Sequence, residues 1–281
     1  MTASLSTRRA RRHVLPGLPL TLGYATLYLS LIVLIPLAAL ILKAATLGAD
    51  GFLDAVTSPR VLAALRVSFF TALAASLINV PIGLIIAWTL TRYRVPGRRL
   101  IDALIDLPFA LPTAVAGITL TTLLAPNGWL GAPLAEAGIR VAYTPLGIIV
   151  ALTFIGLPFV VRSLQPVLED LGPEPEEAAR SLGATPTQTF WRVTLPALYP
   201  ALLSGFTLAL ARTVGEYGSV VFISGNLPFK TEIAPLLIVG KLEQYDYAGA
   251  AAVAVAMLVI SVALLLAANT AQARLSRRGE R

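Results

Sequence analysis

An arginine and a glutamate stand four residues apart, at Arg212 and Glu216, within a largely apolar stretch. In an α-helix this spacing puts both side chains on one face. If the helix begins near Tyr199, Arg212 lies about 20 Å along it, past the middle of a ~30 Å hydrocarbon core. A charge at that depth is costly and is usually functional or paired. Two interpretations stay open: an ion pair that locks the helix, or positive potential along a transport pathway.

A second pair with helical spacing, Asp102 and Asp106, follows Arg98 and Arg99. Two carboxylates can perform acid–base catalysis only with a pocket and a substrate, and the sequence indicates neither, so we expect a solvated or salt-bridged interface. The chain has no cysteine, and its single histidine, His13, lies in a basic cluster. We therefore predict no catalytic residue, no metal site and no cofactor bound by this chain.

The composition indicates an integral membrane protein surrounded by lipid. Hydrophobic residues make up 56% of the chain and charged residues 13%, and the mean hydropathy is +0.77. Soluble domains carry about 25% charged residues. The net charge of +7 lies at the ends of apolar segments rather than along one face, which argues against a nucleic-acid partner.

Six stretches without Asp, Glu, Lys or Arg predict six transmembrane helices, because a span needs about 20 apolar residues and the alternation of barrel strands is missing. The stretches are 14–42, 67–91, 107–135, 141–161, 193–211 and 247–273. The first is longer than the about 7–15 apolar residues of a secretory signal, so we expect an uncleaved helix.

Most basic residues lie on one side of these spans. Arginine clusters precede the first stretch and follow the second and the sixth, and further arginines lie between the fourth and fifth. Positive residues are retained in the cytoplasm, so both termini should lie there. We predict basic cytoplasmic tails at 1–19 and 271–281 and one six-helix domain at 20–270.

Between the fourth and fifth stretches, the polar segment 162–197 should lie in the cytoplasm. Its Gly-Pro-Glu-Pro-Glu-Glu run predicts a helix start, and Gly183 predicts the end about eight residues later. Thr185 and Gln188 then form a capping-box pattern for a second helix. An isolated helix below ~12 residues is marginal in water, so this one must dock, either on its own bundle or on a partner.

The spacing of this segment resembles the EAA loop of permease subunits in bacterial ABC importers. The similarity lies in Glu-Ala-Ala, three residues, Gly, nine residues, an aliphatic residue, one more residue and Leu-Pro. The resemblance implies an all-α type I importer permease fold, with a coupling loop at 170–196 that contacts a cytoplasmic ATPase. The residues it assigns to coupling are Glu177, Ala178, Ala179, Gly183, Phe190, Leu195 and Pro196.

The stretches LPFALPTAVAGITL (107–120) and ARTVGEYGSVVFISGN (211–226) resemble sulfate/thiosulfate importer permeases. Molybdate and tungstate permeases share part of this pattern and remain an alternative. The implied function is a transmembrane pathway for sulfate or thiosulfate in the bacterial inner membrane. The candidate pathway residues are Arg212, Glu216, Thr113, Thr119, Ser219 and Asn226.

The chain has no Gly-x4-Gly-Lys-Ser/Thr phosphate loop, so ATP and Mg²⁺ are expected on a partner. The resemblance implies two ATPase subunits, a second homologous permease and an external sulfate-binding protein. A stand-alone secondary transporter would need more buried ionisable residues and inverted repeats. A purely structural membrane scaffold would leave the spacing of the polar loop unexplained.

Overall fold

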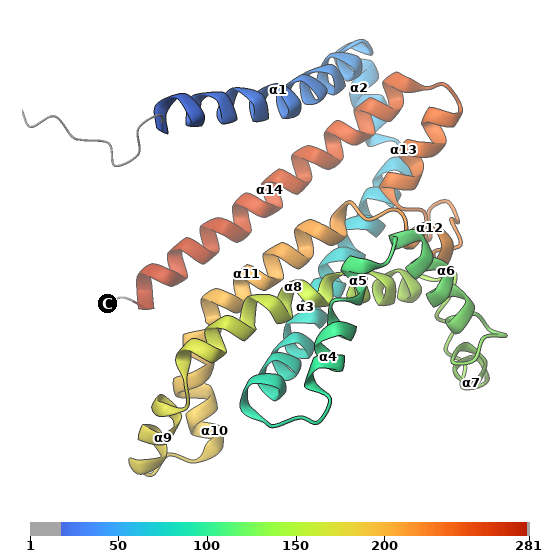
Figure 1. Cartoon of the computed structure of the whole chain (residues 1–281). Coiled ribbons are helices and arrows are strands. Elements are labelled where there is room, and N and C mark those ends of the chain that lie inside the picture. The colour runs from blue at the N-terminus through green and yellow to red at the C-terminus, as the bar shows by residue number, and fades with distance from the viewer. Residues whose placement is uncertain (1–17, 280–281) are drawn as a thin grey trace, which may run out of the picture.

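The computed structural model describes residues 18–279, and within that range every regular element is a helix (Figure 1). Among the described residues, five helices are long and apolar enough to cross a membrane. They are α1 (Leu18–Ala45), α3 (Pro59–Arg92), α8 (Pro145–Leu171), the continuous helix Pro186–Val214 and α14 (Tyr247–Gly279). The shorter helices include α2 (Gly48–Thr57) and α13 (Ala234–Glu243).

The core of the bundle is the packing of α3, α8 and α11 (Leu195–Val214). Glycines allow this close approach: a Cβ at Gly83 would stand 2.6 Å from a Val160 methyl, and one at Gly205 would stand 2.9 Å from the Val160 backbone. Small residues at helix contacts are typical of membrane bundles, where dispersion contacts replace the hydrophobic effect. The three helices therefore form one tightly packed unit.

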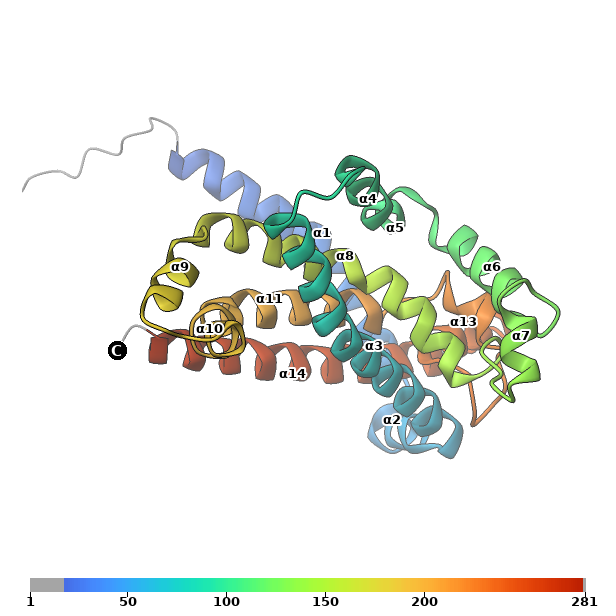
Figure 2. The same cartoon turned by 90° about the horizontal axis from the view of Figure 1, so that it is seen from below.

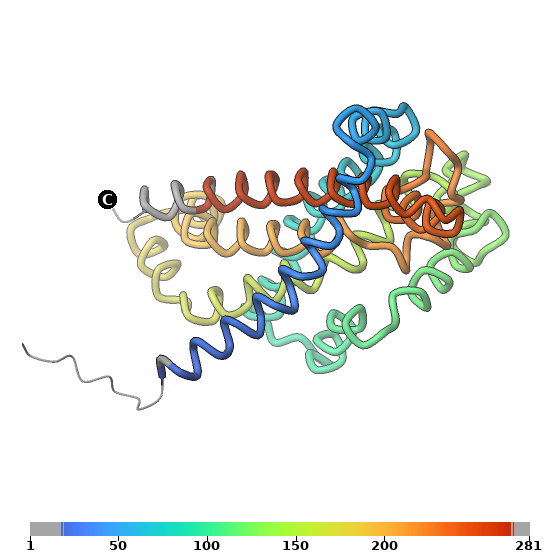
Figure 3. The backbone as a smooth tube through the Cα atoms, turned by 90° about the horizontal axis from the view of Figure 1, so that it is seen from above, coloured from blue at the N-terminus to red at the C-terminus, as the bar shows by residue number. Residues whose placement is uncertain are grey.

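Helix α1 stands apart from this unit and contacts α14 and α2. Figure 3 shows it crossing the bundle obliquely. Its apolar side chains, from Leu20 to Leu42, are mostly exposed. A continuous apolar surface of this kind is stable in hydrocarbon rather than in water, which agrees with a multi-pass membrane protein.

The two ends of the bundle carry different segments. The start of α1, the polar loop with α9 (Glu174–Ser181) and α10 (Pro186–Thr189), and the end of α14 lie at one end, and α2, α7 (Gly131–Glu136) and α13 lie at the other (Figure 2). This grouping matches the predicted sidedness of the charge clusters. The compartment that each end faces stays a prediction, and residues 1–17 and 280–281 of the predicted tails lie outside the described residues.

The third predicted span, 107–135, is not one continuous helix. It is divided into α5 (Leu107–Ala110), α6 (Thr113–Leu124) and α7, preceded by α4 (Arg98–Ile105). Leu111 is extended because the following Pro112 disfavours the helical conformation there. At 1.5 Å per residue, α6 alone is about 18 Å long and does not cross a ~30 Å core. The count of six spans therefore stays a prediction, compatible with the five long helices.

The fifth span begins earlier than predicted. Helix α10 continues through a π-helical turn, η1 (Phe190–Thr194), into α11 without interruption. Because α11 ends at Val214, Arg212 occupies its last turn, where the helix dipole favours a cation. The chain then forms an open turn and a short helix, α12 (Val220–Ile223).

Candidate functional site

The polar loop is built from two short helices joined at a glycine. Helix α9 spans eight residues with three glutamates in its first turn, as the sequence predicts. Gly183 has φ +85°, a left-handed conformation that favours glycine. The N–H of Gly183 donates to Arg180 O at 2.9 Å and that of Ala184 to Ala179 O at 3.0 Å, the pattern of a Schellman C-cap. The predicted helix end at Gly183 is confirmed.

The second helix of the loop starts with the predicted capping box. The N–H of Gln188 donates to Thr185 Oγ1 at 3.3 Å, and the N–H of Thr185 donates to Gln188 Oε1 at 3.0 Å. Pro186 at the first helical position has no N–H that would be left unpaired. The two helices therefore meet at a fixed corner, because both of the ends that flank Gly183 are capped.

The predicted coupling residues divide by exposure. Glu177, Ala178, Gly183 and Pro196 are exposed, Ala179 and Phe190 are half-buried, and Leu195 is buried. The first group faces outward, where a partner can reach it, while Leu195 joins the core between α3, α8 and α11.

Two loop residues were missed by the sequence analysis. Leu182, beside the corner, exposes 89% of its surface and lies among polar neighbours. Glu176 is buried at 7% exposure, whereas the adjacent Glu177 is exposed. Two consecutive glutamates give no sequence signal as to which faces the protein, but a leucine beside a helix-ending glycine in a polar loop was a signal for Leu182.

A contact at the end of α3 anchors the loop. Arg92 Nη2 donates to the Gly172 carbonyl at 2.6 Å and lies 3.1 Å from Glu176 Oε1. The same guanidinium lies over the Trp88 ring, 5.7 Å from its centroid, and Trp88 packs edge-on against Phe190 at 5.8 Å. One end of one membrane helix thus contacts the loop before, within and after α9.

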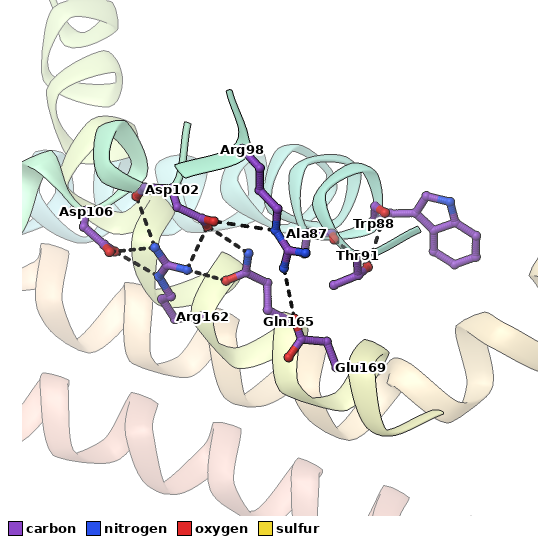
Figure 4. Close-up of polar contacts among 9 residues, drawn as sticks. All are labelled: Ala87, Trp88, Thr91, Arg98, Asp102, Asp106, Arg162, Gln165 and Glu169. Carbon is purple, nitrogen blue, oxygen red and sulfur yellow. Dashed lines mark hydrogen bonds and ion pairs between the residues drawn. The ribbon is translucent and has the colours of Figure 1, made fainter. Parts of the chain in front are cut away.

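Asp102 and Asp106 form an ionic network rather than a catalytic pair (Figure 4). Arg162 donates to both Asp106 oxygens, at 2.9 and 2.6 Å, and to Asp102 Oδ1 at 3.1 Å. It also donates to Gln165 Oε1 at 2.5 Å, while Arg98 donates to Glu169 at 3.1 Å. The predicted salt-bridged interface is confirmed, and it ties the α4–α5 segment to α8.

Arg212 and Glu216 are paired, as one of the two interpretations requires. Arg212 Nη1 donates to Glu216 Oε2 at 2.6 Å, and the backbone N–H and hydroxyl of Ser219 donate to Glu216 Oε1 at 3.0 and 3.1 Å. Both carboxylate oxygens are therefore satisfied. The glutamate side chain is 3% exposed, but that of Arg212 is 38% exposed, so other guanidinium N–H groups remain accessible.

The other candidate pathway residues do not form one group in the structure. A Cβ at Gly218 would touch the Thr113 hydroxyl, and one at Gly117 would touch the Ser219 backbone, so α6 lies directly against the turn after α11. Thr119 instead lines an open cavity of about 710 Å³. Asn226 contacts its own loop, where its Oδ1 accepts a hydrogen bond from Ser224 Oγ at 2.6 Å.

Comparison with known proteins places this architecture in a family. The model of the binding-protein-dependent transport system inner membrane component matches residues 79–281. The sulfate transport system permease protein CysT of Salmonella typhimurium is 51% identical over 267 residues, 95% of this chain and 96% of that protein. CysT of Synechocystis is 51% identical over 246 residues, 88% of this chain and 86% of that protein.

The fold also matches a solved transporter. A bacterial alginate ABC transporter, solved in complex with an alginate pentasaccharide-bound periplasmic protein, aligns with a TM-score of 0.75 at 19% identity. The alignment covers 92% of this chain and 94% of that one, and it supports the fold alone. On the identity and coverage of its sequence relatives, the chain belongs to the CysT family of sulfate transport system permeases, within the inner membrane components of binding-protein-dependent transport systems.

Proposed function

We propose that this chain is the permease subunit of an ABC importer that carries sulfate or thiosulfate across the bacterial inner membrane. The main support for this proposal is the polar loop, whose corner is fixed by caps on both sides and presents an exposed leucine to a partner. The cargo is supported by the sulfate permeases that the chain resembles at 51% identity. ATP hydrolysis then belongs to a partner subunit, together with ATP and Mg²⁺.

The loop suits insertion into a groove of a cytoplasmic ATPase. Leu182 at the corner offers an apolar anchor, and the exposed Ala178 allows close approach of a partner backbone. Burying an exposed leucine side chain fully at an interface contributes about 1.5–3 kcal/mol. Glu177, exposed on the same short helix, is available to pair with a cation of the ATPase.

Arg212 is proposed to give positive potential to the sulfate pathway. Its pairing with Glu216 removes the repulsion that a bare carboxylate would exert on a dianion, while the exposed part of the guanidinium can still donate hydrogen bonds. A partly neutralised arginine also releases its cargo more readily than an unpaired one. Thr113 and Ser219 lie beside this pair, and we assign Thr119 and Asn226 secondary positions along the path.

The complete importer is proposed to contain a second homologous permease, two ATPase subunits and an extracytoplasmic sulfate-binding protein. The alginate transporter of the same fold has a periplasmic protein bound, which supports this arrangement in general terms. The end of the bundle that carries the loop then faces the cytoplasm, as do both termini.

Uptake of radiolabelled sulfate in a deletion strain tests the cargo. We expect uptake that excess thiosulfate inhibits and excess molybdate does not. Inhibition by molybdate or tungstate without inhibition by thiosulfate would instead assign the chain to the related molybdate permeases.

Two variants test the roles within the chain. Gly183→Asp should leave the protein inserted but uncouple sulfate uptake from ATP hydrolysis, because it adds a negative charge to the docking corner. Arg212→Gln should reduce uptake at unchanged membrane abundance. Wild-type transport by the first variant would refute the coupling role, and wild-type transport by the second would remove Arg212 from the pathway.

A further inference from the structure

Arg92, the last residue of α3, holds the polar loop to the membrane bundle. Its side chain is 15% exposed and its partner Glu176 is 9% exposed. The same guanidinium donates to the carbonyl of Gly172, where α8 passes into α9. Within the described residues α9 packs mainly on η1 and α10, so this contact is its most direct link to α3.

The ion pair between Arg92 and Glu176 is incompletely formed. Nη2 and Oε1 lie 3.1 Å apart, but Oε1 accepts no aligned hydrogen bond, and the buried Arg92 Nε has no partner among the described residues. Arginine frequently pairs with a carboxylate through two parallel N–H groups. A buried donor of Arg92 and a buried acceptor of Glu176 therefore both lack a hydrogen bond, while the second carboxylate oxygen of Glu176 lies 3.8 Å from Arg180 Nη2.

Two other arginines of this chain do form such paired contacts. Arg60 donates to Glu232 through Nε at 2.9 Å and Nη2 at 2.7 Å, and Arg162 engages both oxygens of Asp106. Among the ion pairs of the described residues, the one on the loop is the pair in which both partners have a buried atom without a hydrogen bond. Because buried polar groups are seldom left unsatisfied, a small displacement of α9 that aligns Glu176 with Nε and Nη2 would be favourable.

We propose that Arg92 and Glu176 form a joint that transmits movement of the loop to α3, and that closure of the ATPase shifts α9 so that the pair becomes bidentate. This inference rests on the proposed function. The joint then pulls on a helix packed along α8 and α11, whose Ser76 Oγ lies 3.5 Å from Thr213 Oγ1, next to Arg212. Arg92 and Glu176 are positioning residues, and neither touches the cargo.

The test uses the assembled importer in proteoliposomes, with sulfate import and ATP hydrolysis measured on the same preparation. Arg92→Lys keeps the charge but cannot form two parallel bonds. Glu176→Gln keeps the shape but removes the charge. Each should lower the sulfate imported per ATP by roughly tenfold, the effect of one charge-assisted hydrogen bond. Arg94→Lys and Glu174→Gln are matched controls, because both residues are exposed in the same segments.

A second measurement keeps the proposal testable if the Arg92 or Glu176 variants assemble poorly. The wild-type chain contains no cysteine, so Arg92→Cys with Glu176→Cys creates one unique thiol pair. In complexes whose other subunits lack cysteine, the unlinked double variant should show the same low ratio. A short bis-methanethiosulfonate reagent, which joins the two thiols through disulfides, should restore the ratio by linking α9 to α3 again, and a reductant that cleaves these disulfides should abolish the recovery.

The outcomes separate the joint from a general structural role. Three results would each refute the proposed joint. They are a loss of transport and ATP hydrolysis in equal proportion, an unchanged ratio of sulfate imported per ATP in Arg92→Lys, and no recovery of that ratio on cross-linking. Those results leave sulfate import by the wild-type complex intact. Failure of the wild-type complex to import sulfate would count against the proposed cargo instead.

Discussion

Substitutions at Gly183 separate two explanations of why the loop has a glycine at its corner. The residue has φ +85°, and a Cβ built on it meets no atom within 4 Å. Inside this chain the glycine is therefore required by backbone conformation and not by lack of space. A partner that packs against the corner would add a second, steric requirement.

The expected magnitudes follow from the left-handed conformation. Alanine there costs about 1–2 kcal/mol, asparagine less than about 1 kcal/mol because it tolerates this region, and the β-branched valine about 1–3 kcal/mol. A cost of 1–2 kcal/mol lowers the population of the capped corner by about 5–30-fold. If docking needs the capped corner, the apparent affinity for the ATPase falls by up to the same factor.

The assay measures ATPase binding to the permease in lipid nanodiscs, together with ATP-driven sulfate uptake. We expect the order glycine, asparagine, alanine, valine from strongest to weakest binding. Gly183→Asp has nearly the shape of Gly183→Asn, so the difference between these two variants isolates the added negative charge.

The relative binding of Gly183→Ala and Gly183→Asn distinguishes the conformational requirement from the steric one. Alanine is the smaller side chain, so a steric requirement of the partner ranks it above asparagine, whereas the backbone requirement ranks it below. Binding that is weaker for Gly183→Asn than for Gly183→Ala would refute the conformational explanation. Equal binding by all variants would refute any role of the corner in docking.

Three further predictions concern stability, each checked by thermal unfolding of the purified protein in detergent. Gly117→Ala should lower the midpoint or prevent folding because the new Cβ overlaps backbone across the helix contact, whereas Gly240→Ala, which meets no atom within 4 Å, should not. Arg162→Gln should cost about 1–3 kcal/mol, since its partners are only partly exposed, while Arg99→Gln should cost little. Hydrogen bonds from Lys241 and from the Gly249 N–H lower the pKa of Asp246, so Asp246→Asn should lower the midpoint at pH 7 but not once the pH falls below the folded pKa of that carboxyl, where the wild type has lost the same contribution.

The local structure of the polar loop could be predicted from sequence because its determinants are neighbours in the chain. Proline and three glutamates start α9, a glycine ends it, and Thr185 with Gln188 starts the next helix. Each of these signals acts within four residues. The same is true of Arg212 and Glu216, whose pairing follows from their helical spacing.

Contacts between distant segments were not predictable in this way. The burial of Glu176 depends on Arg92, 84 positions earlier, and the pairing of Arg162 depends on how α4 and α5 lie against α8. The break before α6 was a different kind of error. Pro112 stands in the sequence at this break, but the apolar pattern continues on both sides of it, and hydropathy alone cannot tell a bent span from a broken one.

The π-helical turn η1 has a consequence for how this protein can change over evolution. A π turn holds one residue more than an α turn, and this one lies in an otherwise unbroken helix from Pro186 to Val214. Deleting a single residue there would restore α-helical winding and leave the residues on either side of the turn facing nearly as they do now, because the wide turn already accommodates one extra residue. The turn should therefore tolerate loss of one residue better than the α-helical remainder of the same helix, where a deletion would rotate everything beyond it by about 100°.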